Sequence, residues 1–170
     1  DYILQVARKW VSAPFHADGW RLDVAADLGH SPEYNHRFWA KFRDTVKEAN
    51  PHALIVAEHY GDPSEWLKGD EWDTVMNYDA FMEPVSWFLT GLEKHSDEAN
   101  ESLYGNGKAF FEMMRYHMLR MQTSSLMTAM NELSNHDHSR FLTRSNRRIG
   151  RLGTAGAAAA SEGISYGIFR

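Results

Sequence analysis

Along the stretch GWRLDVAADL, apolar and polar positions alternate with a period of two, which is typical of a β-strand. Trp20, Leu22 and Val24 fall on one face of the expected strand, and Arg21 and Asp23 fall on the other. Charged side chains are seldom buried unless they are paired or take part in a function. We therefore expect a strand whose apolar face is buried in the core and whose charged face serves a specific purpose.

The remaining pattern predicts helices and strands in alternation. Ser31 is a candidate N-cap, Pro32 occupies the first helical position, and Asn50 and Pro51 end that helix. The apolar run ALIVA is typical of a strand buried on both faces. The expected helices cover residues 2–11, 32–49, 84–92 and the segment that follows the breaker at 105–107 as far as residue 121, and the alanine-rich tail at 153–163 is expected to be a short surface helix or a mobile segment. The expected strands cover residues 16–25, 53–61 and 72–79, and residues 128–141 are expected to form the last strand and its polar exit loop.

This order of strands and helices predicts an α/β fold. The helices are long enough to cross back over a sheet, so the strands are expected to be parallel and to form successive βα units. A complete (β/α)8 barrel needs about 250 residues, and its functional residues gather at the carboxyl ends of the strands. The chain begins without methionine and ends without a cap signal. We therefore expect residues 1–170 to be a fragment of a single barrel domain, about half of a complete one.

Composition narrows the class of protein. The chain has 170 residues, of which 43% are hydrophobic and 24% are charged, as in an ordinary soluble globular protein. A net charge of −5 predicts no binding to nucleic acid or to an anionic membrane, and no apolar stretch is long enough to span a bilayer. The single basic run, residues 144–148, is expected to be a solvated loop. Absence of cysteine excludes disulfides, thiolate metal sites and cysteine nucleophiles, and fits a cytoplasmic protein without excluding a secreted one.

Three carboxylates end three of the expected strands: Asp23, Glu58 and Asp137. Neighbouring strands lie about 4.8 Å apart, so two strand-end carboxyl groups could approach to about 5 Å, the separation that retaining glycosidases use. Such a pair needs one nucleophile and one general acid. Arg21 favours the nucleophile role for Asp23, and the apolar run before Glu58 favours the acid role for that residue.

Each signal also has a structural interpretation. The Arg-x-Asp pair can be a structural ion pair, and Glu58 can face a helix end. The sequence NHDHS permits a metal site, because His136 and His138 would share a face of a strand, as in barrel metallohydrolases. A metal-dependent hydrolase therefore remains an alternative, which predicts bound metal and inactivation by a chelator.

Four segments, taken in order, resemble the α-amylase family of glycoside hydrolases (family thirteen). DGWRLDVA, VAEHYGDP and LSNHDHSRF are similar to the segments at the ends of the fourth, fifth and seventh barrel strands of that family. WLKGDEWDTVMNYD is similar to the sixth-strand segment of its neopullulanase and cyclomaltodextrinase branch. The resemblance implies a partial (β/α)8 barrel, roughly strands four to seven with their helices, without the N-terminal strands and strand eight.

The resemblance also implies roles for individual residues. Asp23 would be the nucleophile, Glu58 the general acid and then the general base, and Asp137 the third carboxylate, which stabilises the transition state through the sugar hydroxyls. Arg21 would hold Asp23, and His136 would hydrogen-bond the sugar at the cleavage subsite.

Further contacts and partners follow from the same resemblance. His59, Tyr78 and Trp20 are weaker candidates for substrate contact. The expected partner is an α-glucan oligosaccharide, hydrolysed with retention at mainly α-1,4 bonds. No cofactor and no metal are expected in this chain, although the family allows a structural calcium elsewhere in the protein, and the oligomeric state stays open.

The chain also departs from the family pattern. Ala26 and Asp27 stand where the cyclodextrin- and pullulan-cleaving branch often has Asn-Glu, and the family's third-strand region is absent. A transglycosidase of the same family, or a catalytically silent carbohydrate-binding subunit, is the alternative. The isolated fragment is expected to be inactive.

Overall fold

The computed structural model describes residues 2–145 and divides them into two compact units. The first unit contains residues 2–76 and 119–130, and the second contains residues 77–118 and 131–145. Each unit is described by itself. Among the helices of residues 2–145, none is both long enough and apolar enough to cross a membrane.

The first unit is built on a parallel sheet of three strands in the order β1-β2-β3. Leu22 pairs with Ala57, which in turn pairs with Val75, and both strand pairs are parallel. The predicted parallel βα arrangement is thus confirmed. The elements are α1 (Tyr2–Val11), β1 (Gly19–Leu22), a 3-10 turn (Ala25–Asp27), α2 (Pro32–Ala49), β2 (Leu54–Ala57), β3 (Thr74–Val75) and α5 (Thr123–Met127).

The helix α2 begins and ends where its sequence signals predicted. The Ser31 hydroxyl accepts a hydrogen bond from the Tyr34 N–H at 3.2 Å, and Pro32 follows at the first helical position. At the other end, the Asn50 N–H donates to the Val46 carbonyl at 2.8 Å. The N-cap, which satisfies one of the unpaired first-turn donors, therefore fixes the start of the helix.

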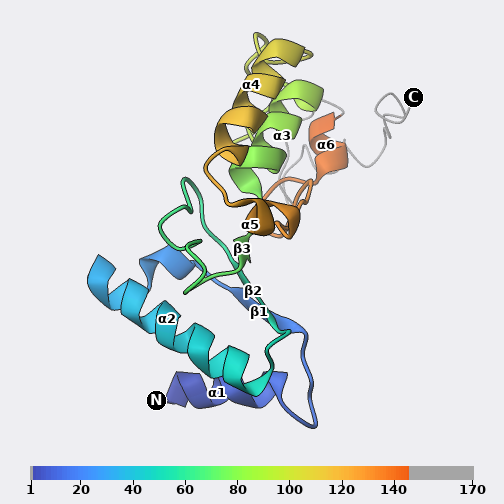
Figure 1. Ribbon diagram of the computed structural model, residues 1–170. Helices are drawn as coiled ribbons and strands as arrows, with labels where there is room; N and C mark the ends of the chain where they lie inside the picture. Colours follow the sequence, from blue (N-terminus) through green and yellow to red (C-terminus); the bar gives the residue numbers. More distant parts are fainter. Residues whose placement is uncertain (1, 146–170) are drawn as a thin grey trace. The chain divides into compact units, whose positions relative to one another are not determined.

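One face of the sheet packs against α1 and α2, which lie side by side in Figure 1. The core of this layer consists of residues from both helices, the strands and the loops between them: Ala7, Val11, Leu22, Ala25, Trp39, Phe42, Val46, Ala53, Ile55, Ala57, Leu67, Trp72 and Val75. Trp20 packs against this core and donates its indole N–H to the Ala7 carbonyl at 3.1 Å. Period-two alternation places Arg21, Val56 and Thr74 on the opposite face.

The expectation that Val24 lies with Trp20 and Leu22 on the apolar face of the strand is wrong. β1 ends at Leu22, and Val24 has a φ of 44°, in the left-handed region, with 52% of its surface exposed. The chain therefore turns at Val24, and the period-two pattern no longer applies there.

The second unit consists of helices joined by turns and loops within its described residues. A π-helical turn (Tyr78–Met82) leads into α3 (Glu83–Thr90), and α4 (Gly107–Met118) packs beside α3 (Figure 1). Both helices were predicted, and each ends a few residues earlier than expected: α3 at Thr90 and α4 at Met118. The short helices α5 and α6 (Phe141–Ser145) were not predicted.

Of the last strand and the polar exit loop expected within residues 128–141, the loop is confirmed, but the strand is wrong except for one bridge. Met130 makes one parallel bridge with Met76, and residues 131–140 form a loop. In this loop the Asn135 side-chain oxygen accepts a hydrogen bond from the Asp137 N–H at 2.9 Å. Such local side-chain bonds give the backbone an alternative to strand pairing.

The basic run at 144–148 is not the expected solvated loop at its first residue. Arg144 is fully buried and donates to the carbonyls of Leu133 at 2.6 Å, Ser139 at 2.9 Å and Lys94 at 3.3 Å. Burial lowers the pKa of Arg144, and the nearby Asp97 partly opposes this effect. Residues 146–148 and the expected helix at 153–163 lie outside the described residues.

Substituting Gly19 with alanine should destabilise the first unit severely. A Cβ at this position would lie 2.0 Å from the Leu54 carbonyl oxygen and 2.7 Å from the Leu54 nitrogen, and neither backbone atom can move without breaking the β1-β2 pairing. We expect Gly19→Ala to lower the free energy of unfolding of the full-length protein by about 3 kcal/mol, measured by urea denaturation. Gly107→Ala, where a Cβ would meet no atom within 4 Å, is the control and should leave stability unchanged or raised. Equal stability of the two variants would contradict this explanation.

Candidate active site

The candidate site forms at the carboxyl end of the parallel sheet. Asp23 directly follows Leu22, and Glu58 directly follows Ala57, which is the register partner of Leu22. The Glu58 N–H donates to the Leu22 carbonyl at 2.8 Å and continues the ladder. The two carboxylates therefore occupy equivalent positions at the ends of neighbouring strands.

Arg21 joins these two carboxylates. One guanidinium nitrogen, Nη1, contacts Asp23 Oδ1, and the other, Nη2, lies 3.2 Å from Glu58 Oε1. Its Nε donates to the Met76 sulfur at 3.3 Å, which fixes the plane of the group. Because one guanidinium spans both contacts, the two carboxyl groups lie within the reach of a single side chain. The sequence suggested Arg21 as a partner of Asp23, but it gave no sign of the contact with Glu58.

The surroundings of the two carboxylates differ. The Asp23 side chain is 77% exposed, whereas that of Glu58 is 7% exposed. Glu58 Oε2 also accepts a hydrogen bond from the Val24 N–H at 2.9 Å. The two carboxylates therefore differ in exposure and in hydrogen bonding, although they end neighbouring strands.

A hollow of about 250 Å³ opens onto Glu58. It is lined by Val24, Ala26, Asp27, Glu58, His59 and Tyr60. An aromatic ring beside polar groups suits a sugar, which has an apolar ring face and hydroxyls at its edge.

His59 lies at the side of this hollow and against two indole rings. Its ring centroid is 5.0 Å from that of Trp66 and 5.9 Å from that of Trp72, and these two indoles stack at 4.8 Å. The arrangement leaves His59 half-buried and lining the hollow, so it can reach a ligand with one edge of its ring.

Asp137, His136 and Tyr78 belong to the second unit. Asp137 and His136 are exposed on the loop, with His136 Nε2 3.6 Å from Asp137 Oδ2. Tyr78 is 1% exposed, and its hydroxyl accepts a hydrogen bond from Asn135 Nδ2 at 2.9 Å. Tyr78 therefore bonds to the loop that carries Asp137, and its expected contact with substrate stays a prediction.

The proposed metal pair does not share a face. His136 is exposed, whereas His138 is buried, with its Nδ1 2.6 Å from Asn135 Oδ1. The metal alternative assumed a strand here, and the segment is a loop. Within residues 2–145, no three or more His, Asp or Glu side chains are arranged to hold a metal ion.

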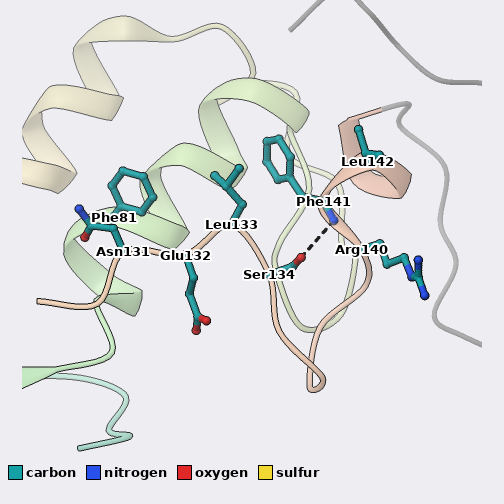
Figure 2. Close-up of a pocket in the computed structure, with 8 residues that line it drawn as sticks. All are labelled: Phe81, Asn131, Glu132, Leu133, Ser134, Arg140, Phe141 and Leu142. Atoms are coloured by element: carbon teal, nitrogen blue, oxygen red, sulfur yellow. Dashed lines mark hydrogen bonds between the residues drawn. The ribbon is translucent and has the colours of Figure 1, made fainter. Parts of the chain in front are cut away.

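The second unit contains a separate hollow of about 710 Å³, shown in Figure 2. It is lined by Phe81, Asn131, Glu132, Leu133, Ser134, Arg140, Phe141 and Leu142. In Figure 2 the Leu133 side chain points toward Phe141, while the carboxylate of Glu132 points the other way. None of the residues that the sequence assigned to the site lines this hollow.

The fold and this geometry define a class: an α/β domain of parallel βα units that presents an arginine-linked pair of carboxylates at the carboxyl edge of its sheet. Residues 1–165 match the family described as alpha amylase, catalytic domain, and the chain therefore belongs to the α-amylase family.

Individual proteins show the same relationship. The chain is 36% identical over 151 residues to a cyclomaltodextrinase of Thermoanaerobacter pseudethanolicus, covering 89% of this chain and 23% of that protein. It is 40% identical over 143 residues to neopullulanase 2 of Thermoactinomyces vulgaris, covering 84% of this chain and 21% of that protein. A solved structure, the debranching enzyme from Nostoc punctiforme, superposes with a TM-score of 0.70 at 31% identity, covering 85% of this chain and 29% of that one. The chain thus spans less than a quarter of the length of these two curated relatives.

His138 should make the second unit sensitive to acid. Burial, followed by the charges of His95, Arg144 and Lys94, lowers the pKa of His138 to about 4 from its ordinary value of 6.5. The unfolded chain therefore binds a proton more readily, so this stabilisation is complete above pH 6.5 and is lost as the pH falls toward 4. We expect a loss of about 3 kcal/mol across this window, measured as the free energy of unfolding at several pH values.

His138→Gln should flatten this pH dependence, because the proton-binding group is removed. The exposed neighbour His136 provides the control, since His136→Gln should retain the slope of the wild type. Identical slopes in both variants would show that other groups cause the acid sensitivity.

Proposed function

We propose that this chain is the part of an α-amylase-type (β/α)8 barrel that contains roughly strands four to seven, a fragment of one catalytic domain. The whole protein is proposed to hydrolyse α-glucosidic bonds, mainly α-1,4, in maltodextrin-like oligosaccharides, with retention of configuration. Family membership and the parallel sheet support this assignment. The observation that carries it is the placement of Asp23 and Glu58 at equivalent strand ends with Arg21 in contact with both.

In this mechanism Asp23 attacks the anomeric carbon and forms the covalent glycosyl-enzyme, while Glu58 gives its proton to the departing glycosidic oxygen. Glu58 then takes a proton from water, which attacks the same carbon and releases Asp23. The high exposure of Asp23 leaves it accessible to a sugar, and the burial of Glu58 suits proton transfer away from bulk water.

The remaining roles are proposed for residues of the loop at 131–140 and for His59. Asp137 is proposed as the third carboxylate, which binds sugar hydroxyls more strongly in the transition state, and His136 as a hydrogen-bond donor to the same sugar. Their exposure on the loop permits such contacts. His59 is proposed as a contact at the side of the Glu58 hollow.

The relatives guide the choice of substrate. They are named as a cyclomaltodextrinase and a neopullulanase, so cyclic and branched maltodextrins are the first compounds to test. Ala26 and Asp27 differ from the Asn-Glu that this branch often has, and Ala26 and Asp27 both line the hollow. A difference in preference between these substrates would arise there.

Asp23→Asn and Glu58→Gln should each abolish turnover in the full-length enzyme. Both changes keep the shape of the side chain but remove the nucleophile or the proton donor, so kcat on maltooligosaccharides is expected to fall by about 10³-fold or more. The measurement is reducing-sugar release, with circular dichroism to confirm the fold.

Asp44→Asn, on the exposed face of α2, is the control and should retain wild-type turnover. Proton NMR of the first product should show the α-anomer, as retention requires, and longer products would reveal transglycosylation. Near wild-type activity of either carboxylate variant, or a β-anomeric product, would refute the proposed roles.

A further inference from the structure

The turn that follows β1 is held in a costly conformation. Val24 has φ 44° and ψ 45°, and a β-branched residue in the left-handed region is disfavoured by about 1 to 2 kcal/mol. Such a conformation persists only where surrounding contacts determine it. The contacts of this turn with Glu58 and with α2 account for its persistence.

The turn holds Glu58 at two points. The Val24 N–H donates to Glu58 Oε2 at 2.9 Å, and the Ala25 N–H donates to the Glu58 carbonyl at 3.2 Å. The first bond orients the carboxylate, and the second ties the same residue's backbone to the turn. The left-handed turn therefore contributes two of the contacts that hold Glu58 in place.

Asn35 of α2 holds the turn from the other side. Its amide nitrogen donates to the carbonyls of Ala25 at 2.9 Å, Ala26 at 3.0 Å and Leu28 at 3.0 Å. The Asn35 oxygen accepts from the Trp66 indole N–H at 2.8 Å, and the whole side chain is 2% exposed. The amide nitrogen of this buried side chain thus bonds only to carbonyls of the turn, and the bond from Trp66 to its oxygen fixes the orientation of the amide.

Trp39 supplies a second, independent donor. It lies one helical turn beyond Asn35, and its indole N–H reaches the Ala25 carbonyl at 2.8 Å. Because the Ala25 N–H bonds to the Glu58 carbonyl and the Ala25 carbonyl accepts from α2, the helix is linked to Glu58 through a single residue.

We propose that Asn35 is a positioning residue for Glu58, acting through the turn Val24–Leu28 and without touching the substrate. The inference rests on the proposed role of Glu58 as the general acid. It predicts a selective defect in proton donation to the leaving group, because the turn bonds to Glu58, whereas the contact of Asp23 is with Arg21, outside the turn.

The test compares two substrates in the full-length enzyme. Maltooligosaccharides need a proton on the leaving oxygen, whereas α-maltosyl fluoride loses fluoride without one. Asn35→Asp keeps the size of the side chain but turns an acceptor toward three carbonyls. We expect kcat/KM on maltooligosaccharides to fall about 10- to 100-fold, as a shift of about 1 Å in a catalytic group produces, while kcat/KM on the fluoride stays within about threefold.

Two further variants keep the test decisive. Ser31→Ala removes the N-cap of the same helix, at about 1 kcal/mol, without touching the turn, so it should lower Tm but affect both substrates equally. Trp39→Phe removes the second donor and retains the ring, and should show a weaker form of the selective loss, about threefold to tenfold. It replaces Asn35→Asp if that variant does not fold.

The outcomes are separable. Selective loss on maltooligosaccharides in Asn35→Asp or Trp39→Phe supports the inference. Equal loss on both substrates, matching Ser31→Ala at the same change in Tm, overturns it while leaving the proposed function intact. A wild-type enzyme that cleaves neither substrate refutes the proposed function itself.

Discussion

The register between β1 and β2 is the constraint on which the candidate site depends. Leu22 lies opposite Ala57, and this pairing alone places Asp23 beside Glu58. A slip of one residue would turn every side chain of the strand to the other face and separate the two carboxylates. Gly19 contributes to this register, because only a residue without a Cβ allows its backbone to approach Leu54 so closely.

Once the register has placed Asp23 beside Glu58, the positive charge of Arg21 is the main electrostatic contact that the two carboxylates share. Arg21 contacts Asp23 and Glu58 together, so the repulsion between two neighbouring carboxylates is offset by a group that lies between them. The two acids differ in their exposure, since Asp23 faces solvent and Glu58 is buried and bonded to the turn. A structural ion pair would need only one of these acids, and the shared contact therefore argues for a functional pair.

Local signals made much of the fold predictable. The N-cap and proline of α2, the apolar run of β2 and the alternation of β1 each depend on a few consecutive residues, and all three elements were predicted. The failures involve contacts between distant residues. Arg144 in a basic run is buried because carbonyls of Lys94, Leu133 and Ser139 surround it, and nothing in its own neighbourhood of the sequence indicates that. Likewise, the expected strand before Asp137 is a loop held by Asn135, whose bonding partners no periodicity reveals.

The helix α2 shows why the same limit applies to the site. Asn35, Trp39, Phe42 and Val46 form one buried stripe at helical spacing, and in the sequence Asn35 is a polar interruption of that stripe. A buried amide costs free energy unless its hydrogen bonds are satisfied, and the turn Val24–Leu28 leaves carbonyls that need donors. The Asn35 amide needs acceptors and the carbonyls of the turn need donors, so each satisfies the other. The donors lie on the same face of α2 that packs into the core. The helix that stabilises the sheet is therefore also the element that holds the turn beside Glu58, so the packing of the core and the geometry of the candidate site depend on the same helix face.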